Sequence, residues 1–79
     1  MIELDQRPGF YYVSVRDGGR TGLLAGPFAK HAEAILLVDE ARRVAEQVND
    51  RAPFYWFGTC RSEKDLGPGK LNERLGVAA

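Results

Sequence analysis

Two aromatic runs on either side of the only long helical stretch constrain this fold more than any other feature of the sequence. Residues 10–15 and 54–57 are rich in aromatic and β-branched side chains, which favour β-strands. Between them, residues 30–48 place apolar side chains at helical spacing. A sheet has two faces and one helix covers only one of them. The sequence therefore predicts a second, aromatic face that needs another covering.

The two halves of a β-hairpin come first. Residues 10–16 alternate as a strand does, and the Asp-Gly-Gly turn at 17–19 favours a tight reversal. A second strand is predicted over residues 20–25, ended by Gly26 and Pro27, and Pro53 is predicted to start a third strand that ends near Cys60. One face of the first strand is predicted to carry Tyr11, Val13 and Val15, and the other Phe10, Tyr12, Ser14 and Arg16.

The helix over residues 30–48 has one apolar stripe and one exception to it. Leu36 lies off the stripe among charged residues, where Leu36 and Arg43 form a candidate protein contact. Past Cys60 the chain is polar, breaks at residues 67–69, and has helical character again over 71–75. The predicted stripe consists of Ala34, Leu37, Val38, Ala41, Val44, Ala45 and Val48.

These elements predict an α+β domain of order β-β-α-β. The strands form a three-stranded antiparallel sheet in the order 2-1-3, with one long helix on one face and a short C-terminal helix. The 79 residues form a single domain, with an N-terminal extension (1–8), a core (9–60) and a C-terminal tail (61–79). A core of this size supplies only about 3–5 kcal/mol, so we expect a homodimer.

Composition excludes several classes of function. Cys60 and His31 are the only residues of their types, which leaves neither a disulfide framework nor a Cys/His zinc cluster. The N-terminus lacks the features of a signal peptide, and no apolar run reaches the length of a membrane span. We expect a cytoplasmic protein with no cofactor, no metal and no membrane partner.

Charge is unevenly distributed although it sums to zero. Residues 31–50 hold two arginines against five acidic residues, a net charge of −3, whereas residues 51–79 carry a net charge of +2. Such asymmetry indicates a charged partner only weakly. A neutral chain is unlike most nucleic-acid-binding proteins, although two subunits together can form a basic groove for double-stranded DNA.

The open aromatic face has three candidate coverings. The C-terminal tail can fold under it with Leu66, Leu71, Leu75 and Val77, a second copy or another protein can bind it, or nucleic-acid bases can stack on it. The first two are compatible with each other. The candidate binding surface comprises Phe10, Tyr12, Arg16, Arg20, Trp56, Arg61 and Lys64.

No residue pattern indicates catalysis. His31 has no serine, cysteine or carboxylate placed by spacing to form a dyad with it, so a surface or packing role is favoured. Arg61 beside Cys60 favours a lower thiol pKa, but a small buried apolar role is the stronger interpretation. The loop at residues 17–20 is not followed by a helix, which favours a turn over a phosphate loop. We expect no enzymatic activity.

Several strings resemble small phage and prophage proteins of proteobacteria, most of them without an assigned function. The resemblance covers residues 10–61 and, loosely, 68–76. In these relatives the helix opens with a Thr-His-Ala-Glu capping box, and Lys30 replaces the threonine here. The matching strings are YVSVRDGGRT at residues 12–21, GPF at 26–28, HAEA at 31–34, VD at 38–39, Arg42, FY at 54–55 and FGT at 57–59.

This resemblance implies a phage accessory protein of the host bacterial cell, without catalytic residues. Small phage proteins of this size include anti-CRISPR proteins, so the leading hypothesis is an inhibitor of a type I CRISPR-Cas system that blocks a protein or DNA-binding surface. The neutral charge argues against DNA mimicry. The alternatives are a phage nucleic-acid-binding module and a structural or assembly protein.

Overall fold

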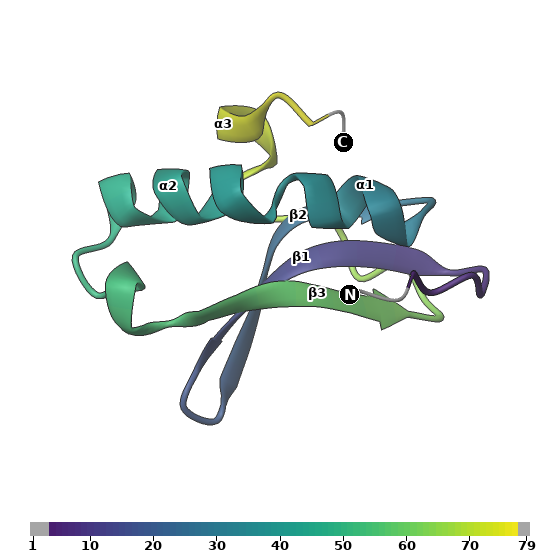
Figure 1. Ribbon diagram of the computed structural model, residues 1–79, viewed down its shortest axis with the longest axis horizontal. Coiled ribbons are helices and arrows are strands. Elements are labelled where there is room, and N and C mark those ends of the chain that lie inside the picture. Colours follow the sequence, from purple (N-terminus) through teal and green to yellow (C-terminus); the bar gives the residue numbers. More distant parts are fainter. Residues whose placement is uncertain (1–3, 78–79) are drawn as a thin grey trace.

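The computed structural model describes residues 4–77, in which two strands, a helical region, a third strand and a final helix follow one another (Figure 1). This order confirms the predicted α+β class. The elements are β1 (Phe10–Asp17), β2 (Arg20–Phe28), α1 (His31–Leu36), α2 (Val38–Val48), the 3-10 turn η1 (Ala52–Phe54), β3 (Trp56–Ser62) and α3 (Asn72–Leu75).

The three strands form one antiparallel sheet in the order β2-β1-β3, as predicted. β1 pairs with β3 over seven residues without a register shift, whereas its pairing with β2 is irregular around Val13. Directly opposite residues share a face. Phe57 lies opposite Val15 and Trp56 opposite Arg16, so Phe57 faces the core and Trp56 faces the other side.

β2 is longer than predicted, because it continues through Gly26 and Pro27 to Phe28. Gly26 has a φ of 126°, and a Cβ at this position would lie 2.7 Å from the carbonyl oxygen of Tyr11. Glycine therefore allows the strand to stay against β1 where any side chain would push it away. The prediction that Gly26 and Pro27 end the strand was wrong.

β3 begins later than predicted. Pro53 lies in η1, where the backbone N–H of Phe54 bonds to the carbonyl oxygen of Arg51 and that of Tyr55 to the oxygen of Ala52. Proline fixes a φ suited to the first turn of a helix, so it starts this turn rather than a strand. Regular pairing starts at Trp56 and ends at Ser62.

The predicted long helix is interrupted at Leu37. The N–H of Leu37 bonds to the carbonyl oxygen of Ala34, three residues back, which tightens the turn between α1 and α2. α1 contacts all three strands, whereas α2 makes its main contacts with β3, η1 and α3 (Figure 1). Lys30 precedes α1 without a side-chain cap, as its replacement of threonine predicted.

The core forms between the sheet and the helices. Most of the predicted stripe is buried or packed against the core, but Val48 is 49% exposed at the end of α2. The buried core residues are Tyr11, Val13, Leu24, Ala25, Ala34, Ala41, Ala45, Ala52 and Leu71.

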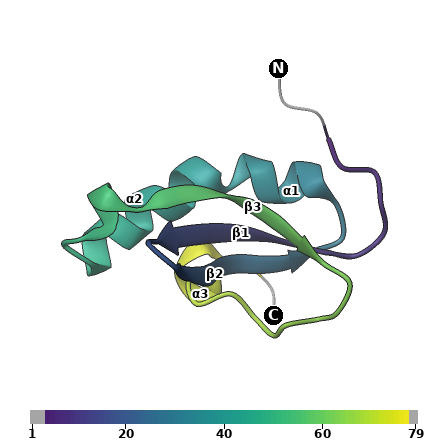
Figure 2. The same ribbon diagram turned by 90° about the horizontal axis from the view of Figure 1, so that it is seen from below.

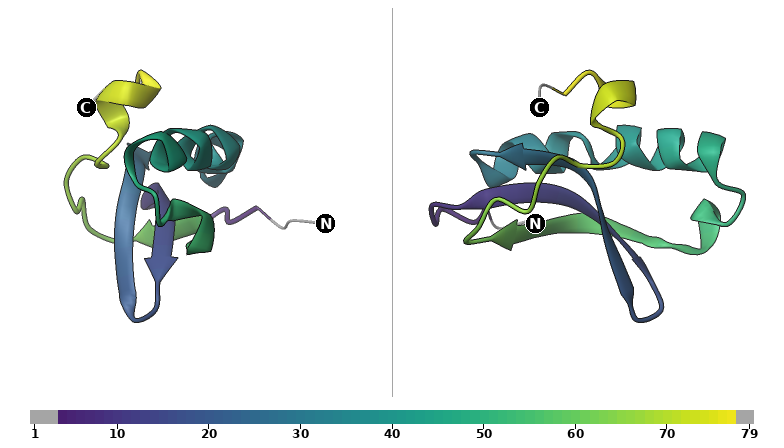
Figure 3. Two further views of the ribbon diagram at one scale, coloured as in Figure 1. Left: turned by 90° about the vertical axis from the view of Figure 1, so that its left-hand side faces the viewer. Right: turned by 180° about the vertical axis from the view of Figure 1, so that it is seen from behind.

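The C-terminal tail crosses the far side of the sheet and then wraps around the edge of β2 (Figures 2 and 3). Residues 69–71 donate backbone hydrogen bonds to the carbonyl oxygens of Gly26, Leu23 and Leu24. The tail thereby occupies the outer edge of β2. Leu71 is buried in the core on the helix side, whereas Leu66 is 57% exposed, so the tail covers the open face only in part.

Candidate functional site

The most exposed aromatic side chains lie together at the start of β3. Phe54 ends η1 and is 82% exposed, and Trp56 starts β3 and is 79% exposed. We call these two residues the aromatic patch. Large aromatic side chains bury much surface when a partner covers them, and they are enriched at protein interfaces. The patch is therefore the first candidate for a contact surface.

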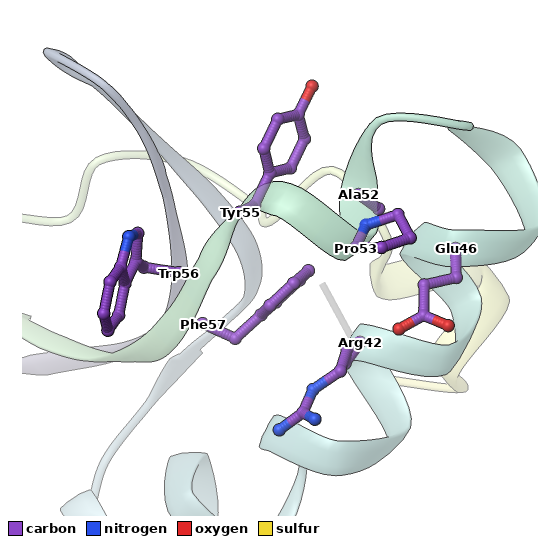
Figure 4. Close-up of a pocket in the computed structure, with 7 residues that line it drawn as sticks. All are labelled: Arg42, Glu46, Ala52, Pro53, Tyr55, Trp56 and Phe57. Atoms are coloured by element: carbon purple, nitrogen blue, oxygen red, sulfur yellow. The ribbon is translucent and has the colours of Figure 1, made fainter.

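On the helix side, β3 forms a hollow with α2. Phe57 points from β3 towards α2, where the guanidinium carbon of Arg42 lies 5.8 Å from the centre of its ring (Figure 4). Trp56 points away on the opposite side of the strand. The hollow has a volume of about 340 Å³ and is lined by Arg42, Glu46, Ala52, Pro53, Tyr55, Trp56 and Phe57.

A second hollow of about 400 Å³ continues along the same strand, with Phe57 in the lining of both. Its walls are apolar at Ile35 and Val38, and Asp39 adds a carboxylate. We call the two hollows together the β3 groove. The lining of the second hollow is His31, Ile35, Val38, Asp39, Phe57, Gly58 and Thr59.

His31 is fully engaged at the end of this groove. Its Nδ1 accepts the backbone N–H of Asp5 at 2.8 Å, and its Nε2 lies 2.9 Å from Oγ1 of Thr59. A neutral ring that accepts at Nδ1 carries its proton on Nε2, so Nε2 donates to Thr59. The ring also stacks on Tyr11, with centroids 5.5 Å apart. This is a packing role, and no nitrogen is left for a substrate.

The N-terminal segment is fastened beside His31. The Tyr11 hydroxyl donates to the carbonyl oxygens of Arg7 and Asp5. The Asp5 carboxylate accepts hydrogen bonds from the Arg7 side chain and backbone, which hold the pKa of Asp5 well below its ordinary value. The pair fixes the entrance to β1 rather than forming an acid–base site.

Four of the candidate surface residues share the face away from the helices. Arg16 and Trp56 are paired across β1 and β3, and both are exposed. Phe10 is half-buried on this face. Tyr12 is 0% exposed, because its hydroxyl accepts the N–H of Leu66 and donates to the carbonyl oxygen of Gly67. The tail therefore occupies the position that a ligand of Tyr12 would need.

The other three candidates lie apart from this pair. Arg61 pairs with Tyr11 on the helix side, and its guanidinium donates to the carbonyl oxygen of Pro8. Lys64 is exposed in the tail, and Arg20 is exposed at the end of the hairpin. The seven residues thus do not form one continuous surface.

The helix contact was predicted from Leu36 and Arg43. Leu36 is 80% exposed at the end of α1, and Arg43 is exposed on α2. Neither residue lines the β3 groove. They remain a second candidate contact, separate from the aromatic patch.

The described residues offer little for metal or thiol chemistry. Within residues 4–77, no group of three or more His, Cys, Asp or Glu side chains is placed to hold a metal ion. Burial raises the pKa of the Cys60 thiol, which makes it a weaker nucleophile than a free cysteine. None of the helices in that range has the length and apolar character needed to cross a membrane.

One important residue was missed by the sequence reasoning. Asn72 is 4% exposed, and its side chain accepts the N–H of Gly26 at 3.0 Å and donates to the carbonyl oxygen of Gly26 at 2.6 Å. It therefore fastens α3 to β2. An asparagine beside a helical turn is usually read as a cap, so nothing in the sequence indicated this partner.

Comparisons with protein families, with curated proteins and with solved structures found no match to this chain. The resemblance to phage accessory proteins therefore stays a prediction.

Proposed function

We propose that this protein is a non-enzymatic binding protein that contacts a partner protein through the aromatic patch. The observation that carries the proposal is the exposure of Phe54 and Trp56, at 82% and 79%, two positions apart in the sequence where η1 leads into β3. His31, the residue whose type best suits a general base, has both ring nitrogens in hydrogen bonds to other parts of the fold. Binding thus accounts for the exposed residues better than catalysis does.

As its biological role we propose a phage or prophage accessory protein in the cytoplasm of the host bacterium, with inhibition of a type I CRISPR-Cas complex as the specific hypothesis. The resemblance in sequence supports the phage context. The neutral charge and the exposed aromatic residues support inhibition by protein contact rather than by DNA mimicry.

The test is a reconstituted type I surveillance complex and its duplex DNA target. We expect the protein to co-elute with the complex and to reduce DNA binding. The double variant Phe54→Ala, Trp56→Ala should lose both effects, because truncating a residue that dominates an interface costs about 2 kcal/mol or more. Leu66→Ala, which changes an exposed apolar residue outside the patch, is the matched control.

Two results would count against this proposal. If the double variant binds the complex as well as the original protein does, the aromatic patch is not the contact. If Leu36→Ala alone abolishes binding, the contact lies on the helix. Absence of any effect on the complex would remove the anti-CRISPR hypothesis and favour a structural or assembly role.

Nucleic-acid binding is the second candidate, because the adjacent Arg16 and Trp56 combine a charge with a ring on which a base can stack. The separation of Arg61 and Lys64 from this pair makes it the weaker candidate. Retarded DNA migration with a steep salt dependence, lost in Arg16→Ala, would support it.

A homodimer that covers the aromatic patch is a further proposal. It needs no host protein, and it would have to dissociate before the patch could bind another partner. Two rings form a small contact, so we expect self-association to be weak.

A further inference from the structure

The outer edge of β3 is unoccupied within the part of the chain that the structure describes. β3 is an edge strand: β1 pairs with one side of it, and no described strand pairs with its other side. The opposite edge of the sheet is occupied, because residues 69–71 donate three backbone hydrogen bonds to β2. In an antiparallel edge strand, alternate residues direct their N–H and C=O groups outward. Among the described residues, none outside the sheet makes a backbone hydrogen bond to β3.

This edge lacks the usual protection against pairing. Native proteins protect edge strands with proline, lysine, bulges or short length. β3 is seven residues long, contains neither proline nor lysine, and keeps a regular register with β1 throughout. Its one charged residue, Arg61, is already hydrogen-bonded to Pro8.

We propose that the partner contributes an extended segment, which adds as a fourth strand to the outer edge of β3 and places side chains in the β3 groove. This inference rests on the proposed protein-binding function and specifies how the partner binds. The groove runs beside the free edge, between β3 and the helices. In strand addition, backbone hydrogen bonds supply affinity and pockets for alternate side chains supply specificity.

A lone segment fits this edge better than a second copy does. Seen from below, α1 and α2 partly overlap β3 and project beyond its outer edge (Figure 2). Two copies paired antiparallel through β3 would have their helices on the same face, directed at each other across the new pair. An extended segment carries no helix and meets no such obstacle.

The groove also defines the chemistry of the segment. Side chains on the same face of a strand lie about 7 Å apart, and the two hollows adjoin at Phe57. Ile35, Val38 and Phe57 favour an apolar side chain. The Asp39 side chain is 88% exposed, and its contact with Arg42 is long at 3.6 Å. The segment should therefore carry apolar residues at alternate positions with a lysine or arginine next to Asp39.

The test is selection of binders from a library of short displayed peptides, using the intact protein as the target. We expect enriched peptides with alternate apolar residues and a basic residue. Amide hydrogen exchange, followed by NMR, should slow in β3 when such a peptide binds. Successive N–H groups of the bound peptide face alternately towards β3 and away from it. N-methylation of the set that faces β3 should abolish binding, and N-methylation of the other set should leave binding unchanged.

A charge reversal tests the groove separately. Asp39→Lys should weaken binding of the selected peptides about two- to fivefold, the effect of one exposed ion pair. Glu40→Lys is the matched control, because it makes the same change on an exposed acid that does not line the groove.

The two proposals fail in different ways. Strand addition would be overturned by peptides that bind without slowing amide hydrogen exchange in β3, or that tolerate N-methylation at both sets of alternate positions. A selection that enriches no peptide would also overturn it. The aromatic-patch proposal would survive all three results. It fails instead if the double variant at Phe54 and Trp56 still binds its partner, whatever happens at β3.

Discussion

At the scale of single residues, Asn72 shows how a small core is closed by one polar side chain. Its amide meets both backbone groups of Gly26 inside the protein, and Gly26 also accepts the N–H of Gly69. Buried backbone groups need such partners because leaving one unpaired costs desolvation energy. The tail is thus held by directional bonds as well as by the burial of Leu71.

We therefore predict that Asn72→Ala lowers the free energy of unfolding by about 1–3 kcal/mol, the cost of leaving buried backbone groups unpaired. Urea unfolding followed by circular dichroism would measure this. The control is Glu73→Ala at the next, exposed position, which should change little. Equal effects of the two substitutions would mean that the hydrogen bonds between Asn72 and Gly26 contribute nothing to stability.

Tyr12 predicts the behaviour of the protein at high pH. Burial raises the pKa of Tyr12 above its ordinary value, and the nearby Asp65 carboxylate adds to the rise. The fold therefore favours the neutral phenol. Stability is intact below the ordinary tyrosine pKa of about 10 and falls as pH rises through the folded-state pKa, because the unfolded chain loses the proton first.

The measurement is the free energy of unfolding between about pH 9 and pH 11 for the original protein and Tyr12→Phe. The variant should be less stable at neutral pH, since it loses the hydrogen bonds to Leu66 and Gly67, but its stability should decline less at high pH. Parallel pH curves would show that Tyr12 does not control alkaline unfolding.

At the scale of elements, residues 69–71 of the tail pair with the outer edge of β2 as an edge strand would, although no strand pattern in the sequence predicts this. Gly69 makes this contact close: a Cβ there would lie 2.4 Å from the backbone nitrogen of Ala25. Gly69→Ala should therefore separate the tail from β2 and cost about 1–3 kcal/mol, as overpacking does. Gly19→Ala, where a Cβ meets nothing within 4 Å, is the control. Unchanged melting of both variants would contradict a close fit.

The sequence predicted the elements that leave a periodic pattern. Alternation in residues 10–16, the turn at 17–19 and the helical stripe were sufficient for the strand order β2-β1-β3. It did not predict contacts made by the backbone alone, such as the bonds of residues 69–71. The side of β3 that meets the helices was also open, because Phe57 and Trp56 are both apolar and only tertiary packing distinguishes them.

The candidate site was predicted only in part, because alternation along a strand can be read from the sequence and tertiary packing cannot. Trp56 and Arg16 are neighbours on the exposed face. The 2-1-3 order predicted that their strands are adjacent, but the alternation of the third strand did not decide which of its faces carries Trp56. Arg61 lies on the other face, because β3 continues past Cys60 and its alternation continues with it. Tyr12 fits the alternation, but only the path of the tail shows that it is covered.

At the scale of the whole molecule, charge and exposure predict its behaviour in solution. Light scattering of the pure protein should give a mass that rises weakly with concentration, and Trp56→Ala should reduce the rise. Short duplex DNA should not change the mass at low or moderate salt, because the chain is neutral and its basic residues are dispersed. A complex with DNA at low salt would instead favour the nucleic-acid alternative.

The central position of β1 has a consequence for biosynthesis. β1 is the first strand to leave the ribosome, yet β3, its partner on one side, is made only after β2, α1 and α2. Until β3 emerges, β1 can pair only with β2, and its other edge is unpaired along Tyr11, Tyr12 and Val13, the largest fully buried side chains among the described residues. Such a strand is prone to aggregate. A nascent chain from which only β1 and β2 have emerged should therefore be a chaperone substrate, whereas one from which residues up to Ser62 have emerged should hold a paired sheet.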